Sequence, residues 1–563
     1  MAKSPGIQEL VIGPFSGGIN TYSDQAVIAD DEMTDCVNFD ISLDGSLVSR
    51  PPWSLMKGQK TTSTAGGTSP PLCSQIVIGT GTFESQRFVV VSSNHSGAFA
   101  GYIYYVDGPN VGLLAKIADG NYSKAHRYND LVFLVPDIGS SGGAQYNLTS
   151  GLVTLIPTMP SGYASAIYKD RLWISGRQGV AGTESRLYFS DLANFASWPG
   201  SNFFDINPGD GDAVNDLVIY QDNIIIFKNT STYVLSYDTS PAQAVLNIIN
   251  NDIGASGRNC VDVYENSVFV LKYNQVYEMS NYDFIRVSVK LPFVWDPGII
   301  LPPTGPSEVF YRWPIWLRVV GDRVVVRFYN NVYVYHLRLR AWTRWTSNDA
   351  NIKYLGPIMR VDNSNTAALQ GYETYVATSC LTKNYDTQGP GVSGAWNMYF
   401  KLFQMKDIYD NATTENGDIT PPSTPVDISL SMSTKQFNVG LSHRFKRLMH
   451  WGVDCYTGRT VTGTLLPQSV NYQVSWNNLV VYHWHELGTW KYPVTNLPSI
   501  SQVVLQDSAK QIKFIRFAKS LRFRLLKFKL DFVTRGNNSD GPVRIYSITA
   551  FIASKQLTPK AVN

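Results

Sequence analysis

One recurring unit constrains the fold of this chain more than any other feature of its sequence. The unit is an aromatic or apolar residue, one spacer, Asp or Asn, one spacer, and then a run of strand-forming residues. Each copy predicts a strand, a two-residue turn and a second strand, because residues that tolerate turn dihedrals stand between two β-forming runs. The five copies are centred on Tyr128 and Asp130, Tyr168 and Asp170, Tyr220 and Asp222, Tyr264 and Asn266, and Val320 and Asp322.

The intervals between the copies are irregular, but they are centred on the length of one four-stranded propeller blade. A further short strand follows each hairpin, and weaker units occur at 83–108 and 354–380. We therefore predict an all-β chain whose residues 56–410 form a closed β-propeller with six or seven blades. Unrelated hairpins arranged in a β-sandwich are the alternative fold for this stretch.

Composition supports an all-β protein. The chain has 44 Gly and 29 Pro, 13% aromatic residues and only 16% charged residues, against about 25% in an average soluble domain. Disorder, collagen and long-helix proteins are thereby excluded. No uncharged apolar run reaches about 18 residues, and the N-terminus lacks the order of a signal peptide. We expect a soluble protein without a membrane span, made in the cytosol.

Turn residues and composition indicate three further regions outside the predicted propeller. Residues 411–426 are rich in Thr, Asn and Pro and form a linker. In residues 427–563, apolar and polar residues alternate as in strands with one solvent-exposed face, which predicts a β-sandwich. Residues 1–55 form an extended N-terminal arm whose apolar runs are too short to bury a core alone. We expect 38–50 to pack on the parent chain and the first half to reach a partner.

Charge is distributed unequally. Residues 1–427 carry 29 Lys and Arg against 39 Asp and Glu, whereas 428–563 carry 18 against 5. The stretch Lys510–Lys529 alone holds eight basic residues and no acid. We expect this region to dock on an acidic protein surface, with nucleic acid as the alternative. The residues assigned to that interface are Arg444, Lys446, Arg447, Arg522, Arg524, Lys527 and Lys529.

Three stretches resemble a known protein family. The first comprises Gly17-Gly18-Ile19-Asn20, Ala29-Asp30-Asp31-Glu32, Asn38-Phe39-Asp40, Gly45-Ser46-Leu47 and Arg50-Pro51; the others are 185–216 and 434–455. They are similar to propeller-containing minor tail, tail-tip and tail-nozzle proteins of tailed bacteriophages.

The resemblance implies a structural protein of the virion tail, assembled in the host cytoplasm, that supports host attachment and DNA ejection. Its expected partners are other tail proteins, further copies of the chain in a ring, and a host-surface glycan.

Two clusters could bind a metal ion. Asp205, Asp210, Asp212 and Asp216 crowd a Gly-rich loop with Asn207 and form a calcium candidate, although the spacing is not that of an EF-hand. Turns in which these side chains bond their own backbone are the alternative. His483 and His485 would share one strand face, but no third zinc ligand is suggested, so solvated histidines are favoured. We expect no cofactor.

Catalytic motifs are absent from the sequence: it has no G-x-S-x-G, H-E-x-x-H, Walker or G-x-G-x-x-G pattern. We therefore expect no enzymatic activity. A carbohydrate-binding or glycoside-hydrolysing propeller is the alternative, since its two carboxylates can come from distant blades. Tryptophans that could stack on sugars or pack between blades are Trp198, Trp313, Trp342 and Trp345. Free buried thiols are expected at Cys36, Cys73, Cys260, Cys380 and Cys455, which include no C-x-x-C pair.

Overall fold

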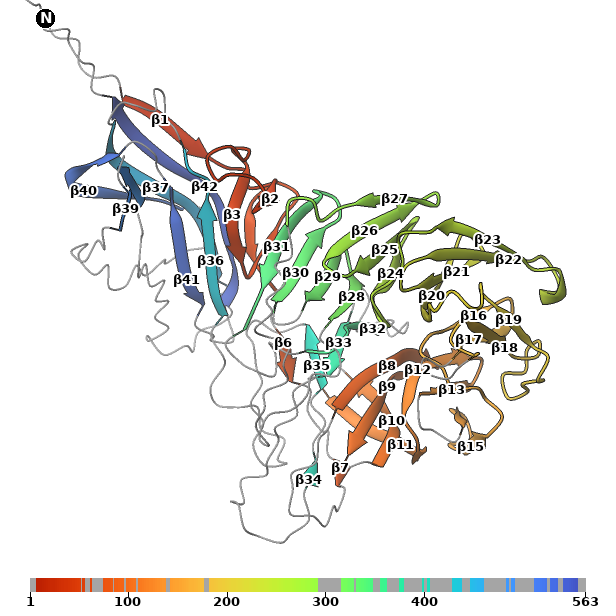
Figure 1. Ribbon diagram of the computed structural model, residues 1–563. Coiled ribbons are helices and arrows are strands. Elements are labelled where there is room, and N and C mark those ends of the chain that lie inside the picture. Colours follow the sequence, from red (N-terminus) through yellow and green to blue (C-terminus); the bar gives the residue numbers. More distant parts are fainter. Residues whose placement is uncertain are drawn as a thin grey trace, which may run out of the picture.

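A computed structural model gives the fold of the chain (Figure 1). It describes residues 7–51, 53–55, 61–62, 74–84, 86–95, 98–107, 110–137, 142–176, 182–291, 315–328, 331–347, 355–361, 374–378, 397–398, 402–405, 428–437, 446–459, 482–485, 488–491, 511–523, 527–534 and 540–554. Within these ranges no helix is long and apolar enough to cross a membrane.

Most of the described chain forms antiparallel groups of four strands, as the all-β prediction requires. The first sheet contains β8 (Ser74–Phe83), β9 (Gln86–His95), β10 (Ala98–Asp107) and β11 (Asn110–Asp119). The second contains β12 (Tyr122–Tyr128), β13 (Leu131–Pro136), β14 (Gly143–Asn147) and β15 (Val153–Ile156). The third contains β16 (Ser165–Tyr168), β17 (Arg171–Ser175), β18 (Arg186–Phe189) and β19 (Phe203–Asp205).

Four further groups follow along the chain. They are β20 (Val214–Tyr220), β21 (Asn223–Lys228), β22 (Thr232–Ser236) and β23 (Val245–Asn250); β24 (Val261–Tyr264), β25 (Ser267–Lys272), β26 (Gln275–Ser280) and β27 (Asp283–Arg286); β28 (Ile315–Val320), β29 (Arg323–Phe328), β30 (Asn331–His336) and β31 (Ala341–Trp345); and β32 (Met359–Val361), β33 (Thr374–Thr378), β35 (Leu402–Met405) and β6 (Trp53–Leu55).

The first strands of successive sheets touch one another in sequence, from β8 through β12, β16, β20, β24 and β28 to β32. Strand β32 in turn touches β8, so the contacts return to their start. This is a propeller-like arrangement, visible as the fan of sheets in Figure 1. The last sheet takes its fourth strand, β6, from within the range 1–55 that we assigned to the arm.

The recurring hairpins occupy equivalent places. Tyr128, Tyr168, Tyr220 and Tyr264 each end the first strand of their sheet. In the third sheet both turn residues, Lys169 and Asp170, have positive φ values of 46° and 54°. That geometry is the type I′ turn that matches the twist of paired strands.

These tyrosines also link neighbouring sheets. The Tyr128 hydroxyl donates to Asp170 Oδ1 at 3.2 Å, in the turn of the next sheet. The Tyr168 hydroxyl donates to the Asp222 carbonyl at 2.7 Å. The Tyr220 hydroxyl repeats the pattern with the Asn266 carbonyl, at 2.9 Å. In these three copies the sequence repeat therefore provides both a hairpin and an inter-sheet hydrogen bond, which we call the tyrosine bond.

The N-terminal and C-terminal segments share two sheets. One contains β1 (Ile7–Ile12), β4 (Phe39–Ile41), β5 (Leu47–Ser49), β37 (Lys446–Arg459), β40 (Gln511–Phe523) and β42 (Asp540–Ser554). The other extends the β28–β31 group by β3 (Glu32–Val37), β36 (Ile428–Thr434) and β41 (Lys529–Thr534), with β2 (Gly18–Ile19) beside β3. Two small pairs complete the described strands: β7 (Thr61–Thr62) with β34 (Asn397–Met398), and β38 (Tyr482–His485) with β39 (Gly488–Lys491).

The expectation that the first half of the arm reaches a partner is wrong. Strand β1 pairs with β42 at six positions, and Phe15 and Ile19 are 1% and 2% exposed. Their apolar side chains share a core with Leu430 and Ile548 of the C-terminal segment. The predicted sandwich at 427–563 therefore does not stand alone, because N-terminal strands form part of its sheets.

We predict that Tyr220→Phe lowers the free energy of unfolding by about 1–2 kcal/mol, because the hydroxyl both donates to Asn266 and accepts from the Asn281 amide. Urea unfolding measures the change. Tyr22→Phe is the matched control, since Tyr22 is 70% exposed. Equal stability of the two variants would show that the tyrosine bond contributes nothing.

Candidate functional site

A cluster of buried polar contacts lies where the N-terminal segment meets the β28–β31 group. We call this place the seam and define it by Asn38, Asp40, Arg50, Arg323 and Trp345. Asn38 and Asp40 flank the start of β4, and Arg50 follows β5. Arg323 begins β29 and Trp345 ends β31, in the second half of the chain. The seam therefore joins parts of the chain that the sequence keeps far apart.

Asp40 is the anionic centre of the seam and is 4% exposed. Its Oδ1 accepts the Trp345 indole N–H at 2.9 Å, and Arg323 Nη2 lies 3.1 Å from its Oδ2. His336 Nε2 lies 3.9 Å from the same carboxylate. Burial lowers the pKa of His336 to about 4, so this histidine is neutral and Arg323 is the charge that balances Asp40.

Asn38 and Arg50 form the second half of the seam. Asn38 has a positive φ of 61°, and its Oδ1 accepts Arg50 Nε at 3.0 Å and the Thr346 amide at 2.6 Å. Its Nδ2 donates to the Ser429 carbonyl in β36 at 2.6 Å. Arg50 Nη2 donates to the Thr346 carbonyl at 3.1 Å. One asparagine therefore ties the N-terminal segment to both the propeller-like part and the C-terminal strands.

Other residues of the first stretch that resembles the phage proteins also make close contacts near the seam. Gly18 has φ 66°, and a Cβ there would lie 2.7 Å from the backbone N and O of Trp342, so only glycine fits. Asn20 Nδ2 donates to Glu32 Oε2 at 2.8 Å, and Lys290 pairs with Glu32 at 2.8 Å. Burial raises the pKa of Glu32, but the bonds from Lys290, Asn20 and the Ala29 amide outweigh it, so the pKa is lowered.

The acidic N-terminal segment meets the basic C-terminal region within the same chain. Residues 1–55 hold 8 acidic against 2 basic residues. Lys435 Nζ lies 2.7 Å from Asp30 Oδ1, and Lys527 donates to Gln25 Oε1 at 2.9 Å. Part of the charge asymmetry that predicted an acidic partner is therefore balanced internally.

The structure places the predicted basic interface only in part. Lys446 is 2% exposed, and burial lowers its pKa. Arg447 and Arg522 are directly opposite each other in the β37–β40 ladder, and Lys529 begins β41. Arg444 and Arg524 lie outside the described residues. Of the seven, Lys446 is unsuited to a surface contact because its side chain lies in the interior.

The four carboxylates of the calcium candidate bond different partners in the structure. Asp205 pairs with Arg186 at 2.8 Å, Asp210 accepts Lys228 Nζ at 2.7 Å, and Asp216 pairs with Lys124 at 2.9 Å. Asp212 accepts the amide and side chain of both Asn229 and Thr230, at 2.6–2.9 Å, which lowers its pKa against the opposing effect of burial. Each carboxylate has its own partner, and no metal-binding group of three such residues occurs within the described ranges.

Polar side chains also line the inner strands. Asp216 is 1% exposed and bonded to Lys124 of the second sheet. Burial raises the pKa of the neighbouring Asp262, and the charge of Asp216 adds to the rise. Both Asp262 oxygens accept backbone amides, from Val319 and Val263, at 2.8 and 2.9 Å. These carboxylates hold strands together and are already engaged by the protein.

His336 and the two described thiols are buried, and His126 is half-buried. His126 Nε2 lies 2.7 Å from Ser165 Oγ, but Ser165 is 2% exposed and burial lowers the pKa of His126 to about 3. Cys36 and Cys260 are free and buried, and burial raises the pKa of each thiol. The side chains of His483, His485 and Cys455, and the whole of Cys73 and Cys380, lie outside the described residues.

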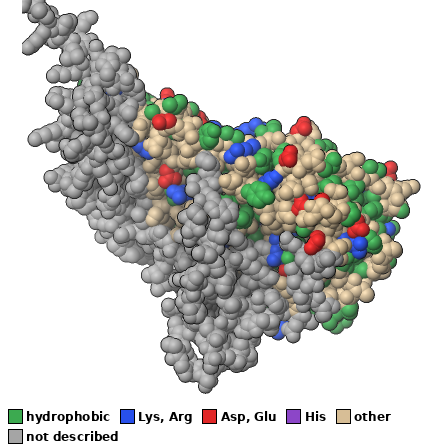
Figure 2. Space-filling view, viewed as in Figure 1, with side chains coloured by type: hydrophobic (Ala, Val, Ile, Leu, Met, Phe, Trp, Pro, Cys, Tyr) green, Lys and Arg blue, Asp and Glu red, His purple; other side chains and the backbone are tan. Residues whose placement is uncertain are grey.

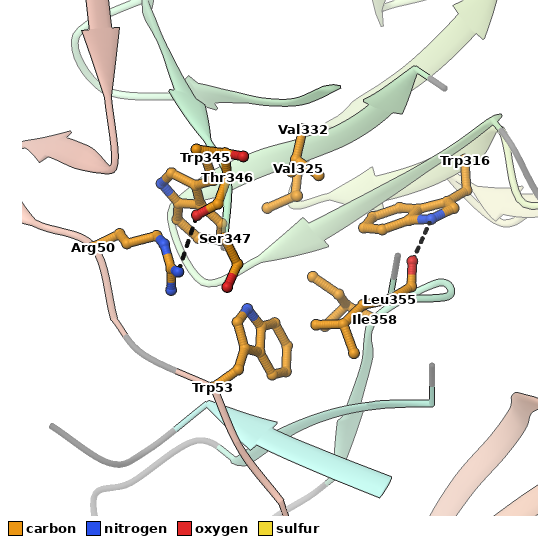
Figure 3. Close-up of a pocket in the computed structure, with 10 residues that line it drawn as sticks. All are labelled: Arg50, Trp53, Trp316, Val325, Val332, Trp345, Thr346, Ser347, Leu355 and Ile358. Carbon is orange, nitrogen blue, oxygen red and sulfur yellow. Dashed lines mark hydrogen bonds between the residues drawn. The ribbon is translucent and has the colours of Figure 1, made fainter. Parts of the chain in front are cut away.

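An aromatic cavity borders the seam. Its volume is about 30 Å³, and Trp53, Trp316 and Trp345 line it (Figure 3). The three indoles are 1–4% exposed, and the N–H groups of Trp316 and Trp345 donate to Leu355 and Asp40. These rings pack between the sixth and seventh sheets.

The other predicted sugar-stacking tryptophans differ in their settings. Trp342 is 1% exposed and donates to the Val287 carbonyl at 3.0 Å, so it packs inside the protein. Trp198 is half-buried and donates to the Phe195 carbonyl at 2.8 Å. Trp313 lies outside the described residues. Trp342 and Trp345 are therefore unavailable for stacking on a sugar.

Sequence reasoning missed Asp40, Arg323 and Trp345 as a unit. Asp40 stands in the first resembling stretch, but its partners lie far along the chain and carry no local signal.

We predict that Asp40→Ala lowers the free energy of unfolding by about 2–4 kcal/mol, because it leaves Arg323 without its closest carboxylate and the Trp345 N–H without an acceptor. Asp30→Ala is the matched control: that carboxylate is 87% exposed, and we expect a loss below about 1 kcal/mol. Denaturant unfolding of both variants gives the comparison. Similar losses would contradict a central role for Asp40.

We predict that stability falls as the pH drops from 7 to 5. His126 and His336 have folded pKa values of about 3 and 4, below the ordinary 6.5, so in this window the unfolded chain binds protons that the folded chain excludes. Each histidine should remove about 1–2 kcal/mol by pH 5. In urea titrations, His336→Gln should therefore make the loss of unfolding free energy between pH 7 and pH 5 smaller by about 1–2 kcal/mol. An unchanged slope would mean that His336 takes up a proton in the folded protein.

No protein-family model matches the sequence, and no curated protein matches it. Among solved structures, the chain is similar to the computationally designed Ika8 protein, with TM-score 0.32, 11% identity, and coverage of 57% of this chain and 84% of that one. It is similar to the Pan2 WD40 domain of Neurospora crassa, with TM-score 0.36, 9% identity, and 64% and 97% coverage. PorZ of Porphyromonas gingivalis gives TM-score 0.30, 10% identity, and 78% and 57% coverage. At these scores none of the likenesses bears on function.

Proposed function

We propose that this chain is a structural protein of a bacteriophage tail, of the minor tail, tail-tip or nozzle kind, and not an enzyme. It would dock on neighbouring tail subunits, in several copies, and support host attachment and DNA ejection. In this proposal the seven four-stranded groups are the blades of one closed propeller, and the sheets shared by the N-terminal and C-terminal segments form a sandwich beside it.

The observation that carries the proposal is the continuous sheet through the seam. Strand β3 pairs with β31 on one side and with β36 on the other, so backbone hydrogen bonds run from the propeller-like part into the C-terminal strands. Two parts joined in this way move together, which suits a subunit that must transmit force during ejection. A linker without strand pairing would instead let the parts move independently.

The residues behind the family resemblance support the same proposal. Gly18, Glu32, Asn38 and Asp40 join the N-terminal segment to other parts of the chain, by close backbone approach, an ion pair or buried bonds, and Asn20 bonds Glu32. The resemblance therefore rests on residues with a shared mechanical role.

A carbohydrate-active propeller is the second candidate, because Asp262 has a raised pKa beside Asp216, the kind of pairing that glycosidases use. Its support is weaker, since both carboxylates are engaged by protein donors. Hydrolysis of host polysaccharide by the purified chain, lost in Asp262→Asn, would favour this candidate over the tail protein.

We predict that the chain is found at a fixed copy number in purified phage particles and that particles lacking it fail to infect. Quantitative mass spectrometry of particles and infectivity counts of a deletion mutant measure both. The control is a deletion mutant supplied with the intact chain from a plasmid. Finding the chain only outside particles would refute the proposal.

A further inference from the structure

Strand β23 is an exposed outer edge of the fourth sheet. It pairs with β22 on one side and ends the sheet on the other. Val245, Leu246 and Ile248 are 53%, 36% and 48% exposed, on both faces of the strand. Figure 2 shows hydrophobic side chains at the end of the molecule where Figure 1 labels β22 and β23. An open edge of this kind is a template for another strand.

The edge lacks the side chains that usually block strand pairing, although a bulge at Ile249 interrupts its ladder with β22 near the end of the strand. Its sequence, VLNIIN, contains no charge, proline or glycine. Other outer strands do carry such features: β11 contains Lys116 and Asp119, and β27 contains Asp283 and Arg286. Charged residues on an edge discourage pairing with another chain. Strand β15 is also uncharged, but it has only four residues.

We propose that β23 is a dimerisation edge, which pairs antiparallel with β23 of a second copy of this chain about a two-fold axis through Asn247. The pairing would join the fourth sheets of two copies into one eight-stranded sheet. This inference does not depend on the proposed function in a phage tail.

The pattern of side chains selects the register. A two-fold axis perpendicular to the sheet maps each face onto itself, so opposed residues must lie on the same face. Centring on Asn247 brings Val245 opposite Ile249 of the second copy. It also brings Leu246 opposite Ile248, and Asn247 opposite its own equivalent. Leu246 and Ile248 then meet on one face, and on the other face the two amides can bond each other across the axis. Val245 faces the bulge at Ile249, so the regular part of the pairing runs from Leu246 to Ile248.

The neighbouring register is less favourable. Centring on Ile248 would set Asn247 opposite Ile249 and Leu246 opposite Asn250, so polar and aliphatic side chains would meet on both faces. Zero charge further favours a second copy as the occupant, because a charged edge would repel its own equivalent. A strand of different sequence would need no such symmetry.

Disulfide trapping in the full chain tests the register. Opposed Cβ atoms in an antiparallel pair lie about 4.5–5.5 Å apart, within a small adjustment of disulfide geometry. Asn247→Cys should therefore form a disulfide-linked dimer under mild oxidation, seen on a non-reducing gel. Val245→Cys should not, because its equivalent lies well away from it along the ladder. The wild-type chain, oxidised in parallel, controls for its five native cysteines.

Sedimentation provides the second measurement. The wild-type chain should form a dimer, and Ile248→Lys should raise the dimer dissociation constant at least tenfold. At concentrations low enough for both chains to be monomeric, their melting temperatures should be equal, because Ile248 is exposed in one copy. Thr154→Cys, on the shorter edge β15, is the matched control and should stay monomeric on oxidising gels. A monomeric wild-type chain, trapping through Thr154→Cys or Val245→Cys, or failure of Asn247→Cys to trap would each overturn the proposal.

Discussion

The architecture depends on one strand, β3, which pairs with β2, β31 and β36. Its register with β36 covers Met33 to Val37, and Val37 also pairs with Arg344 of β31 in parallel. The side chains of Met33 and Cys36 are fully buried, in the core that both parts share. A strand has two edges, and β3 is flanked on both by strands of its own chain, which leaves it no open edge for a neighbouring subunit. The N-terminal segment is therefore an internal element of the fold.

The position of the N-terminal segment inside the fold also bears on the unequal distribution of charge along the chain. A surplus of basic residues in one region indicates an acidic partner, but the physical argument does not say whether that partner belongs to another molecule. Here Asp30 of the acidic N-terminal segment pairs with Lys435 of the basic region, whereas Glu32, Asp35 and Asp40 pair with Lys290, Arg344 and Arg323 of the propeller-like part. The sequence shows that the basic region needs an acidic partner. Which acidic residues lie beside it depends on long-range strand pairing.

The fold could be predicted where the signal was local and repeated. Each hairpin unit combines a turn-forming pair with two β runs, and the same units place a tyrosine at the end of the first strand, as at Tyr168 and Tyr220. The hydrogen bonds of these tyrosines to the next sheet were not predictable, because they depend on how adjacent sheets stack. The joining of β6 to β35, which lies far along the chain, was missed for the same reason: Trp53 stands in a stretch with no repeat signal.

The buried charges of the seam explain why the N-terminal segment has one position. Hydrophobic docking alone is non-directional, and strands with similar apolar patterns can slide by two residues at small cost. Asp40 removes that freedom, because a shift would separate it from both Arg323 and the Trp345 N–H and leave a buried carboxylate unsatisfied. Asn38 adds a backbone requirement, since its positive φ is a conformation that asparagine tolerates better than most residues, and its side chain bonds Arg50 and Thr346 from that position. The apolar core thus supplies the attraction between the segments, and the seam determines their register.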